Sequence, residues 1–485
     1  MKKLINSSFN IIIGLLVVIL LTRCEKTGQL LDVSSEKIAV NFTKYDSLLN
    51  SSPSGWKMLV YPDIKKFNSI KGGFAFFMKF NGKEQTVSML ADFNEKMRTM
   101  PNTGLYSLKF TSLTSISFST YSYINEVGDP NTMVNGGKDL GWGFRVDSEY
   151  SFLRTSANQD TIYLKGNLQN CHALLIRAKP EEEKFFYEDK NYDESINSFA
   201  TATKGKLGLH AKMGEDLIVM TLALDQRQLV LAKNVNEDSV LIHRTGIAYN
   251  GPTSILLGEP FENSGHTITE IKVEAGKILV KGANGENIEV IEKDFPSISA
   301  FKMLRTGAYS TIKVPFNNER FITGYIADNK DWPNYLQVQR FLASTVGADL
   351  GLGFGVITGS VRFYDVSVDF KASQKRFILN VNLGIFDSDN PNAPSPSYKA
   401  ADEFYKKFAF PYQYRYTYNS DEIMTMFYEG PQFVYAAQFP DLKNAFKDSI
   451  LDGDYSFKYT KSPTELLVAF YNKRNNQILF EGRPF

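Results

Sequence analysis

Residue types that could catalyse a reaction or hold a metal are few and scattered in this chain. Its four histidines form neither an H-E-x-x-H pair nor another short metal-ligand spacing: His172, His210, His243 and His266. No G-x-S-x-G segment marks a nucleophile. Asp147 and Glu149 would share one face of a strand, where solvent exposure explains them better than catalysis. The sequence therefore predicts no catalytic residue, no metal site and no cofactor.

Two tryptophans in loop-like contexts are the candidate ligand-binding residues. Trp142 is flanked by Gly141 and Gly143, and Trp332 stands in the segment 331–335, Asp-Trp-Pro-Asn-Tyr. An exposed indole ring at either position could stack on a sugar ring or on a partner protein. The alternative, in which both rings close the rim of a hydrophobic core, remains open from the sequence.

The first two dozen residues have the pattern of a lipoprotein signal. Lys2 and Lys3 precede an apolar block at residues 11–21, which is too short to span a bilayer but suits the core of a signal peptide. We therefore predict a signal peptide over residues 1–23, lipidation of Cys24 (palmitate included), and a polar tether over residues 24–33. Arg23 departs from the pattern, because a small residue usually precedes the modified cysteine.

Cys171 is the other of the two cysteines. If Cys24 is acylated, Cys171 has no intrachain partner, so burial of a hydrophobic core must stabilise this exported chain without a disulfide. Cys171 begins the apolar run 171–176, which is typical of a buried strand. We predict a packed, unreactive thiol.

The charge balance bears on the class of partner. The chain has 54 basic and 53 acidic residues, and the signal peptide contains three basic residues and no acidic one. The mature chain therefore has 51 basic and 53 acidic residues, a net charge of −2. Phosphate binding needs a concentrated basic field, so this balance argues against nucleic acid as a partner.

Most of the chain after residue 56 consists of short runs in which apolar and polar side chains alternate. The 37 Phe and 25 Tyr favour strands, and Asn81-Gly82 is a strong hairpin signal. We predict a mainly β fold with a few helices, in which antiparallel meanders form barrels or sandwiches. Two domains are expected: residues 34–300, with an initial helix, and residues 301–485.

Four segments have the apolar spacing of a helix instead. They lie at residues 38–49, 192–199, 298–304 and 401–408. The third segment marks the expected boundary between the two domains, near residue 300.

Several short segments resemble an uncharacterised family of Bacteroidetes lipoproteins, a domain of unknown function. They are residues 72–74 (Gly-Gly-Phe), 118–122 (Phe-Ser-Thr-Tyr-Ser), 141–143 (Gly-Trp-Gly), 147–150 (Asp-Ser-Glu-Tyr) and 164–166 (Leu-Lys-Gly). Members of that family are often encoded beside starch-utilisation-type outer-membrane uptake systems. The resemblance implies an accessory role in nutrient capture, and it brings no catalytic residue with it.

These observations together lead to one functional hypothesis and one alternative. The first is a lipid-anchored, non-enzymatic accessory protein at the outer membrane or cell surface, on its periplasmic or outer side. It would bind a ligand or partner in nutrient uptake, and an outer-membrane transporter complex is the expected partner. The alternative is a secreted-side hydrolase of glycans or peptides, with carboxylates gathered from distant strands.

Overall fold

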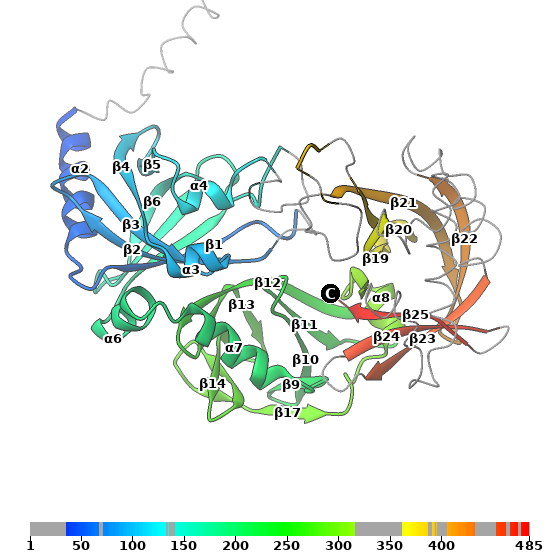
Figure 1. Cartoon of the computed structure of the whole chain (residues 1–485). Coiled ribbons are helices and arrows are strands. Elements are labelled where there is room, and N and C mark those ends of the chain that lie inside the picture. The colour runs from blue at the N-terminus through cyan, green and yellow to red at the C-terminus, as the bar shows by residue number, and fades with distance from the viewer. Residues whose placement is uncertain are drawn as a thin grey trace, which may run out of the picture.

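The chain folds into three antiparallel sheets that follow one another along the sequence (Figure 1). The computed structural model describes residues 35–66, 71–131, 134, 141–315, 361–386, 390–392, 394, 405–431, 453–461, 466–473 and 477–484. The predicted fold class, mainly β with a few helices, is confirmed. Within the described residues, no helix is both long and apolar enough to cross a membrane.

The first sheet is a closed barrel of eight strands in sequence order. It closes where β1 pairs with β8, for example at Trp56 and Arg177. The predicted hairpin at Asn81-Gly82 connects β2 to β3. The strands are β1 (Trp56–Tyr61), β2 (Phe74–Asn81), β3 (Thr86–Ala91), β4 (Asn102–Phe110), β5 (Thr114–Phe118), β6 (Glu149–Thr155), β7 (Thr161–Gly166) and β8 (His172–Arg177).

Helix α2 (Ser35–Asn50) precedes this barrel and packs on it, as the spacing at residues 38–49 predicted. Leu48 and Leu49 join the barrel's interior cluster, and the Trp56 indole donates a hydrogen bond to the Leu49 carbonyl at 2.7 Å. Two short helices, α3 (Glu95–Thr99) and α4 (Tyr123–Val127), lie in the connections between strands.

The second sheet is also closed in effect. Its order is β16-β15-β14-β13-β12-β11-β10-β9-β17, and only Glu289 separates β16 from β17. Because β16 pairs with β15 and β17 pairs with β9, the segment 287–293 acts as one closing strand. The strands are β9 (Gly208–Met213), β10 (Asp216–Ala223), β11 (Gln228–Asn234), β12 (Val240–Gly251), β13 (Ser254–Asn263), β14 (His266–Glu274), β15 (Lys277–Gly282), β16 (Asn287–Ile288) and β17 (Val290–Lys293).

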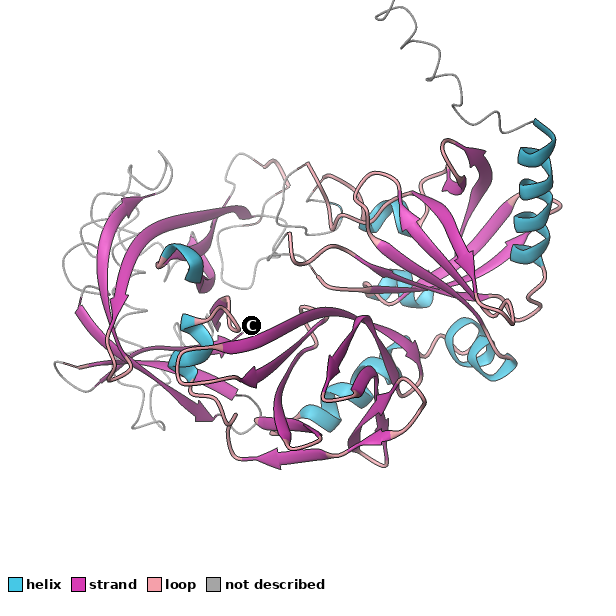
Figure 2. Cartoon of the chain, turned by 180° about the vertical axis from the view of Figure 1, so that it is seen from behind, coloured by secondary structure: helices cyan, strands magenta, loops and turns pink. Residues whose placement is uncertain are grey.

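The expected helix at residues 192–199 is α7 (Tyr192–Thr203), which packs on β12, β14 and β15 (Figure 2). It follows α6 (Pro180–Glu183) and one turn of π-helix, η2 (Lys184–Glu188). Phe199 and Ala202 join the hydrophobic cluster of the second barrel, and the buried Ser195 hydroxyl donates to the Gly251 carbonyl of β12 at 3.0 Å.

The third sheet is a closed barrel with an aromatic core. The rings of Phe377 and Tyr414 stack at 4.8 Å, and Phe457 meets Phe470 edge-on at 4.7 Å. Helix α8 (Ala300–Arg305) precedes it, as predicted. The other elements are β18 (Thr311–Pro315), β19 (Val361–Lys371), η3 (Ala372–Gln374), β20 (Arg376–Phe386), β21 (Tyr405–Tyr418), β22 (Ile423–Pro431), β23 (Gly453–Lys461), β24 (Leu466–Asn472) and β25 (Gln477–Pro484).

The helix expected at residues 401–408 is wrong over the part that the structure describes. Tyr405 and Phe408 belong to β21 and pair with Phe386 and Leu383 of β20. Apolar residues spaced by three or four positions fit a short strand as well as a helix, and the long pairing with β20 decides between them.

The three barrels begin in the same way, with a helix, a glycine of positive φ and then the meander. The glycines are Gly55 after α2 (φ 81°), Gly205 after α7 (φ 75°) and Gly307 after α8 (φ 80°). Glycine adopts this conformation without steric cost, so it can turn the chain toward the first strand of each barrel. Gly205 and Gly307 lie directly after the C-cap residues of α7 and α8, whereas Gly55 follows the turn after α2. Of the two segments expected as domains, residues 34–300 contain the first two barrels and residues 301–485 contain the third.

The first two barrels share a buried hydrophobic cluster. Leu59, Phe77 and Leu90 of the first barrel lie in the same cluster as Leu209 and Leu229 of the second. Alternate residues of β1 to β3 fill the interior of the first barrel instead, because side chains of a strand point to opposite faces. Both faces of these strands are therefore buried, which explains their nearly continuous apolar sequence.

A buried ion pair joins the same two barrels. Arg227 Nη1 lies 2.6 Å from Asp92 Oδ1, and Arg227 Nη2 donates to the Asp92 carbonyl at 2.8 Å. Asp92 Oδ1 also accepts the Ala75 N–H, and Arg227 donates to the Gly73 carbonyl. The pair therefore fixes the loops of the first barrel against the turn between β10 and β11.

Candidate functional site

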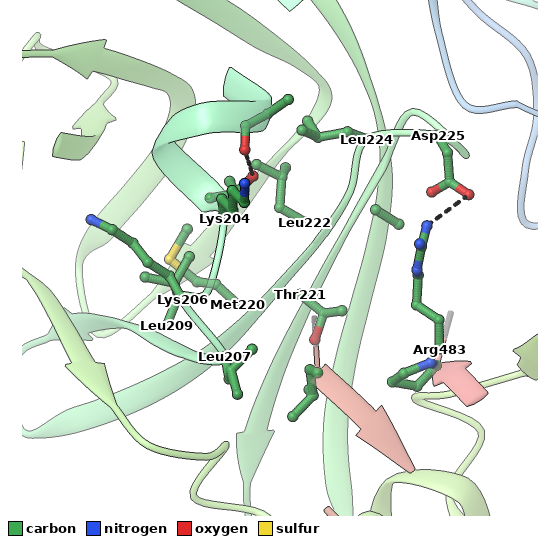
Figure 3. A pocket seen from close by; sticks show the side chains of 15 residues that line it. Lys204, Lys206, Leu207, Leu209, Met220, Thr221, Leu222, Leu224, Asp225 and Arg483 are labelled. Atoms are coloured by element: carbon green, nitrogen blue, oxygen red, sulfur yellow. Dashed lines mark hydrogen bonds and ion pairs between the residues drawn. The ribbon is translucent and has the colours of Figure 1, made fainter. Parts of the chain in front are cut away.

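A groove between the second and third barrels is the first candidate site; we call it the apolar groove (Figure 3). Its volume is about 480 Å³, within the range of small-molecule sites. Most of its described lining is aliphatic, and no described lining residue is aromatic. The lining residues are Ala200, Thr203, Lys204, Lys206, Leu207, Leu209, Met220, Thr221, Leu222, Ala223, Leu224, Asp225, Leu466, Arg483 and Pro484.

Local structure explains how these side chains meet. Helix α7 ends at Thr203, and Gly205 then turns the chain, so the following residues run along the groove into β9. Strand β10 pairs with β9 at Met220 and Leu209 and extends the same wall of the groove. The start of β24 and the end of β25 complete the groove from the third barrel.

Three cations lie at the rim of the apolar groove. Arg483 Nη1 is 3.7 Å from Asp225 Oδ2, and Lys206 Nζ is 3.6 Å from the Glu292 carboxylate. Lys204 has no ion-pair partner within the described part of the chain. Asp225 is the groove's single acidic lining residue among those described. The groove thus combines aliphatic walls with a net positive rim.

A second groove lies between the first and second barrels, and we call it the polar groove. Its volume is about 370 Å³, and its lining is Tyr61, Pro62, Asp63, Ile64, Lys65, Lys66, Asn170, His172, Arg244, Thr245, Gly246, Gly258 and Glu259. The Glu259 carboxylate pairs with Lys65. Asp63 Oδ1 accepts the backbone N–H groups of Lys65 and Lys66, both at 3.2 Å.

Arg244 is the most enclosed charge in the polar groove. Its Nη1 donates to Gln228 Oε1 at 3.1 Å, and its Nη2 donates to the Ala308 carbonyl at 2.9 Å. Burial lowers the pKa of this guanidinium to about 10. Both acceptors are uncharged.

Other buried titratable groups are engaged in structural contacts. The Cys171 thiol donates to Asp147 Oδ2 at 2.9 Å, while Asp147 Oδ1 accepts the backbone N–H groups of Leu168 and Gln169. Burial, followed by the charge of Asp147, raises the pKa of the Cys171 thiol far above its usual range. The prediction of a packed thiol is confirmed, and Asp147 closes the turn between β7 and β8 rather than sharing a solvated face with Glu149.

Of the two sequence-predicted ligand residues the structure describes Trp142, and this residue lines neither groove. Trp142 is 50% exposed, in the loop between α4 and β6, and the Arg145 guanidinium lies 4.7 Å from the centre of its ring. Trp332 lies outside the described residues, as do the predicted signal peptide (1–23), Cys24 and the tether (24–33). Ligand binding by Trp142 and Trp332 stays a prediction.

The structure adds residues that sequence reasoning missed. Lys204, Arg483 and Arg244 stand in no motif, and only the fold brings Lys204 near Arg483. Throughout the described ranges, no group of three or more His, Cys, Asp or Glu side chains is placed to hold a metal ion.

Comparisons with known proteins give a family but no activity. No curated protein matches the chain. The DNA polymerase sliding clamp of Pseudomonas aeruginosa is 11% identical to this chain at a TM-score of 0.09. The match covers 60% of this chain and 61% of the clamp. The Thermotoga maritima DNA polymerase III β subunit is 10% identical at a TM-score of 0.11, over 92% of this chain and 97% of that one. Scores this low carry no argument.

The family comparison concerns the first half of the molecule. A family model described as a domain of unknown function, DUF4302, matches residues 32–275, which include α2, the first barrel and the second barrel as far as β14. The match covers half of the chain, and the chain belongs to the DUF4302 family.

Proposed function

We propose that this chain is a lipid-anchored, non-enzymatic accessory protein that binds a ligand during nutrient uptake at the outer membrane or cell surface. The apolar groove is the ligand site in this proposal. An anchor at Cys24 would keep the site next to a transporter complex, and the helix that follows the tether packs directly onto the first barrel.

The apolar groove carries the proposal because its lining selects one class of ligand. The described lining is aliphatic and has no aromatic ring on which a sugar could stack, but it can bury an alkyl chain well. The rim cations favour an anionic end group. The ligand class is therefore an aliphatic chain with a carboxylate or another anionic head.

The same lining disfavours the hydrolase alternative. Acid–base cleavage of a glycoside requires two carboxylates that face one substrate. The apolar groove has Asp225 alone among its described lining, and this carboxylate lies against Arg483. In the polar groove, Asp63 is held by backbone N–H groups and Glu259 by Lys65.

Calorimetric titration of the purified protein with alkanoates tests the proposal. Octanoate should bind more tightly than octanol, because only octanoate pairs with the rim cations. Each methylene added to the alkanoate should tighten binding about fourfold, since burial of one CH₂ contributes about 0.8 kcal/mol. Affinity that does not depend on chain length would refute burial in the apolar groove.

Two substitutions locate the site. Leu222→Glu places a carboxylate in the aliphatic wall and should abolish binding, whereas Leu241→Glu, on a leucine that is 47% exposed on β12, should leave it unchanged. Lys204→Gln should weaken binding about tenfold, or about 1.4 kcal/mol, with Lys277→Gln as the control. Hydrolysis of a glycan or peptide by the wild-type protein would establish the alternative instead.

The anchor is tested separately. Cys24→Ser should abolish labelling by a palmitate analogue and release the protein from membranes. Membrane retention of this variant would defeat the anchor while leaving the ligand site standing.

A further inference from the structure

We infer that the polar groove is a second binding site, independent of the apolar groove, and that it takes an oxyanion group (carboxylate, sulfate or phosphate) on the guanidinium of Arg244. Three observations support it: the position of Arg244, the absence of a carboxylate partner for it among the described residues, and the charges around it.

Arg244 stands where the three barrels meet. It belongs to β12 of the second barrel, and it lines the polar groove together with Tyr61 and His172 of the first barrel. Its Nη2 reaches the Ala308 carbonyl, which lies just before the first strand of the third barrel. The Arg244 side chain therefore lies at the junction of the three barrels, where the surrounding residues shield it from bulk water.

A shielded guanidinium normally has a carboxylate partner. Buried charges are costly unless they are paired, and arginine presents five N–H donors in a planar fork. Arg244 uses two donors on the uncharged acceptors Gln228 Oε1 and Ala308 O, and it forms no ion pair within the described part of the chain. Burial is also the sole cause of its lowered pKa, with no carboxylate acting against it.

The carboxylates of the groove are committed elsewhere. Glu259 pairs with Lys65, and Asp63 accepts two backbone N–H groups of its own turn. Arg227, the neighbouring arginine of this interface, shows the contrast, because Asp92 compensates its charge at 2.6 Å. Arg244 lines the polar groove, and no acidic side chain of the described residues accepts from its guanidinium.

The remaining lining suits a polar ligand with a negative group. In the described lining, Lys65, Lys66 and Arg244 give three cations against the two carboxylates of Asp63 and Glu259. Asn170 and Thr245 add hydrogen-bonding groups. A planar fork binds an oxyanion through two parallel hydrogen bonds. The volume of about 370 Å³ exceeds the size of a bare inorganic anion, so the groove has room for the body of an organic ligand.

Calorimetric titration of the full-length protein with sulfate and with glucuronate, each against chloride at equal ionic strength, tests this site. Both oxyanions should bind saturably, and Arg244→Gln should abolish this binding. Arg154→Gln, which removes an exposed arginine stacked on Tyr163 of the first barrel, should leave it unchanged. Tighter binding of glucuronate assigns the groove to an organic oxyanion, and equal binding assigns it to the free inorganic ion.

Two further measurements test the site even if Arg244→Gln fails to fold. Arg244→Lys keeps the charge but loses the fork, and it should weaken binding at least tenfold. In the wild-type protein, sulfate should protect Arg244, but not Arg154, from phenylglyoxal, as read by peptide mass spectrometry. Unsaturable binding by the wild type, unchanged affinity of either Arg244 variant, or equal modification of Arg244 with and without sulfate would overturn the inference.

Discussion

Removal of the Asp92 carboxylate should destabilise the first two barrels strongly. In Asp92→Ala, the Arg227 guanidinium, which is 7% exposed, keeps its charge but loses its carboxylate at 2.6 Å. The Ala75 N–H loses its acceptor as well. Breaking a buried ion pair from one side costs about 3–5 kcal/mol. That is a large part of the roughly 5–15 kcal/mol that stabilises a typical domain.

The double variant Asp92→Ala/Arg227→Met separates the cost of the orphaned charge from the loss of packing. Methionine at position 227 removes the charge and keeps an apolar chain beside the ring of Phe74, over which the guanidinium now lies at 5.2 Å. The double variant should therefore be more stable than Asp92→Ala alone. The two substitutions should be coupled by more than about 1 kcal/mol.

Urea unfolding followed by tryptophan fluorescence measures this effect. Trp56 is fully buried in the first barrel and reports its unfolding. Asp189→Ala, which breaks an exposed ion pair with Lys184, is the control and should leave the transition in place. A loss of less than about 1 kcal/mol in Asp92→Ala, or a loss in the double variant equal to the sum of the two single losses, would contradict a stabilising role of the ion pair.

Three further predictions concern single buried groups. Burial lowers the pKa of His210, so the unfolded chain binds a proton at higher pH than the folded chain. The melting temperature should therefore fall as pH drops through about 6.5, and it should fall less in the variant His210→Gln. Cys171 should not react with a thiol reagent in the native protein, because burial and Asp147 raise its thiol pKa, and it should react fully in urea. Gly246→Ala would place a Cβ 1.8 Å from the Gly72 carbonyl oxygen and should cost about 1–3 kcal/mol in urea unfolding.

Each of these predictions has an outcome that contradicts it. An unchanged acid slope in His210→Gln would mean that other groups set the pH dependence. Rapid labelling of native Cys171 would mean that the thiol is accessible. Gly251→Ala is the control for Gly246→Ala, because its Cβ would meet only Ser254 at 3.4 Å, and equal losses in both variants would remove the role of close approach between barrels.

Local patterns in the sequence predicted three helices and one hairpin turn correctly, whereas the strand at residues 405–408 depends on long-range pairing. The apolar stripes of α2, α7 and α8 and the Asn81-Gly82 turn depend on residues close in sequence, and all four are found. The strand character of Tyr405 and Phe408 depends on pairing with β20, which periodicity does not contain.

The two grooves could not be predicted from the sequence, because residues far apart in the chain form them. Lys204 follows a helix of the second barrel and Arg483 ends the last strand of the third, so neither position is marked by a neighbour in sequence. Arg244 looks like an ordinary charge on a strand until its uncharged partners are known. Burial of Cys171, in contrast, was readable from the apolar run around it.

The closure of all three sheets limits how this molecule can recognise a protein partner. A peptide can extend an open sheet by adding a strand to its free edge, but here the first and last strands of each barrel pair with each other, or do so through the split strand 287–293. Among the described strands, no sheet thus offers a whole strand as a template for main-chain pairing. A partner that meets the described strands would be recognised through side chains in grooves and loops, and the closed sheets protect this β-protein from edge-to-edge aggregation.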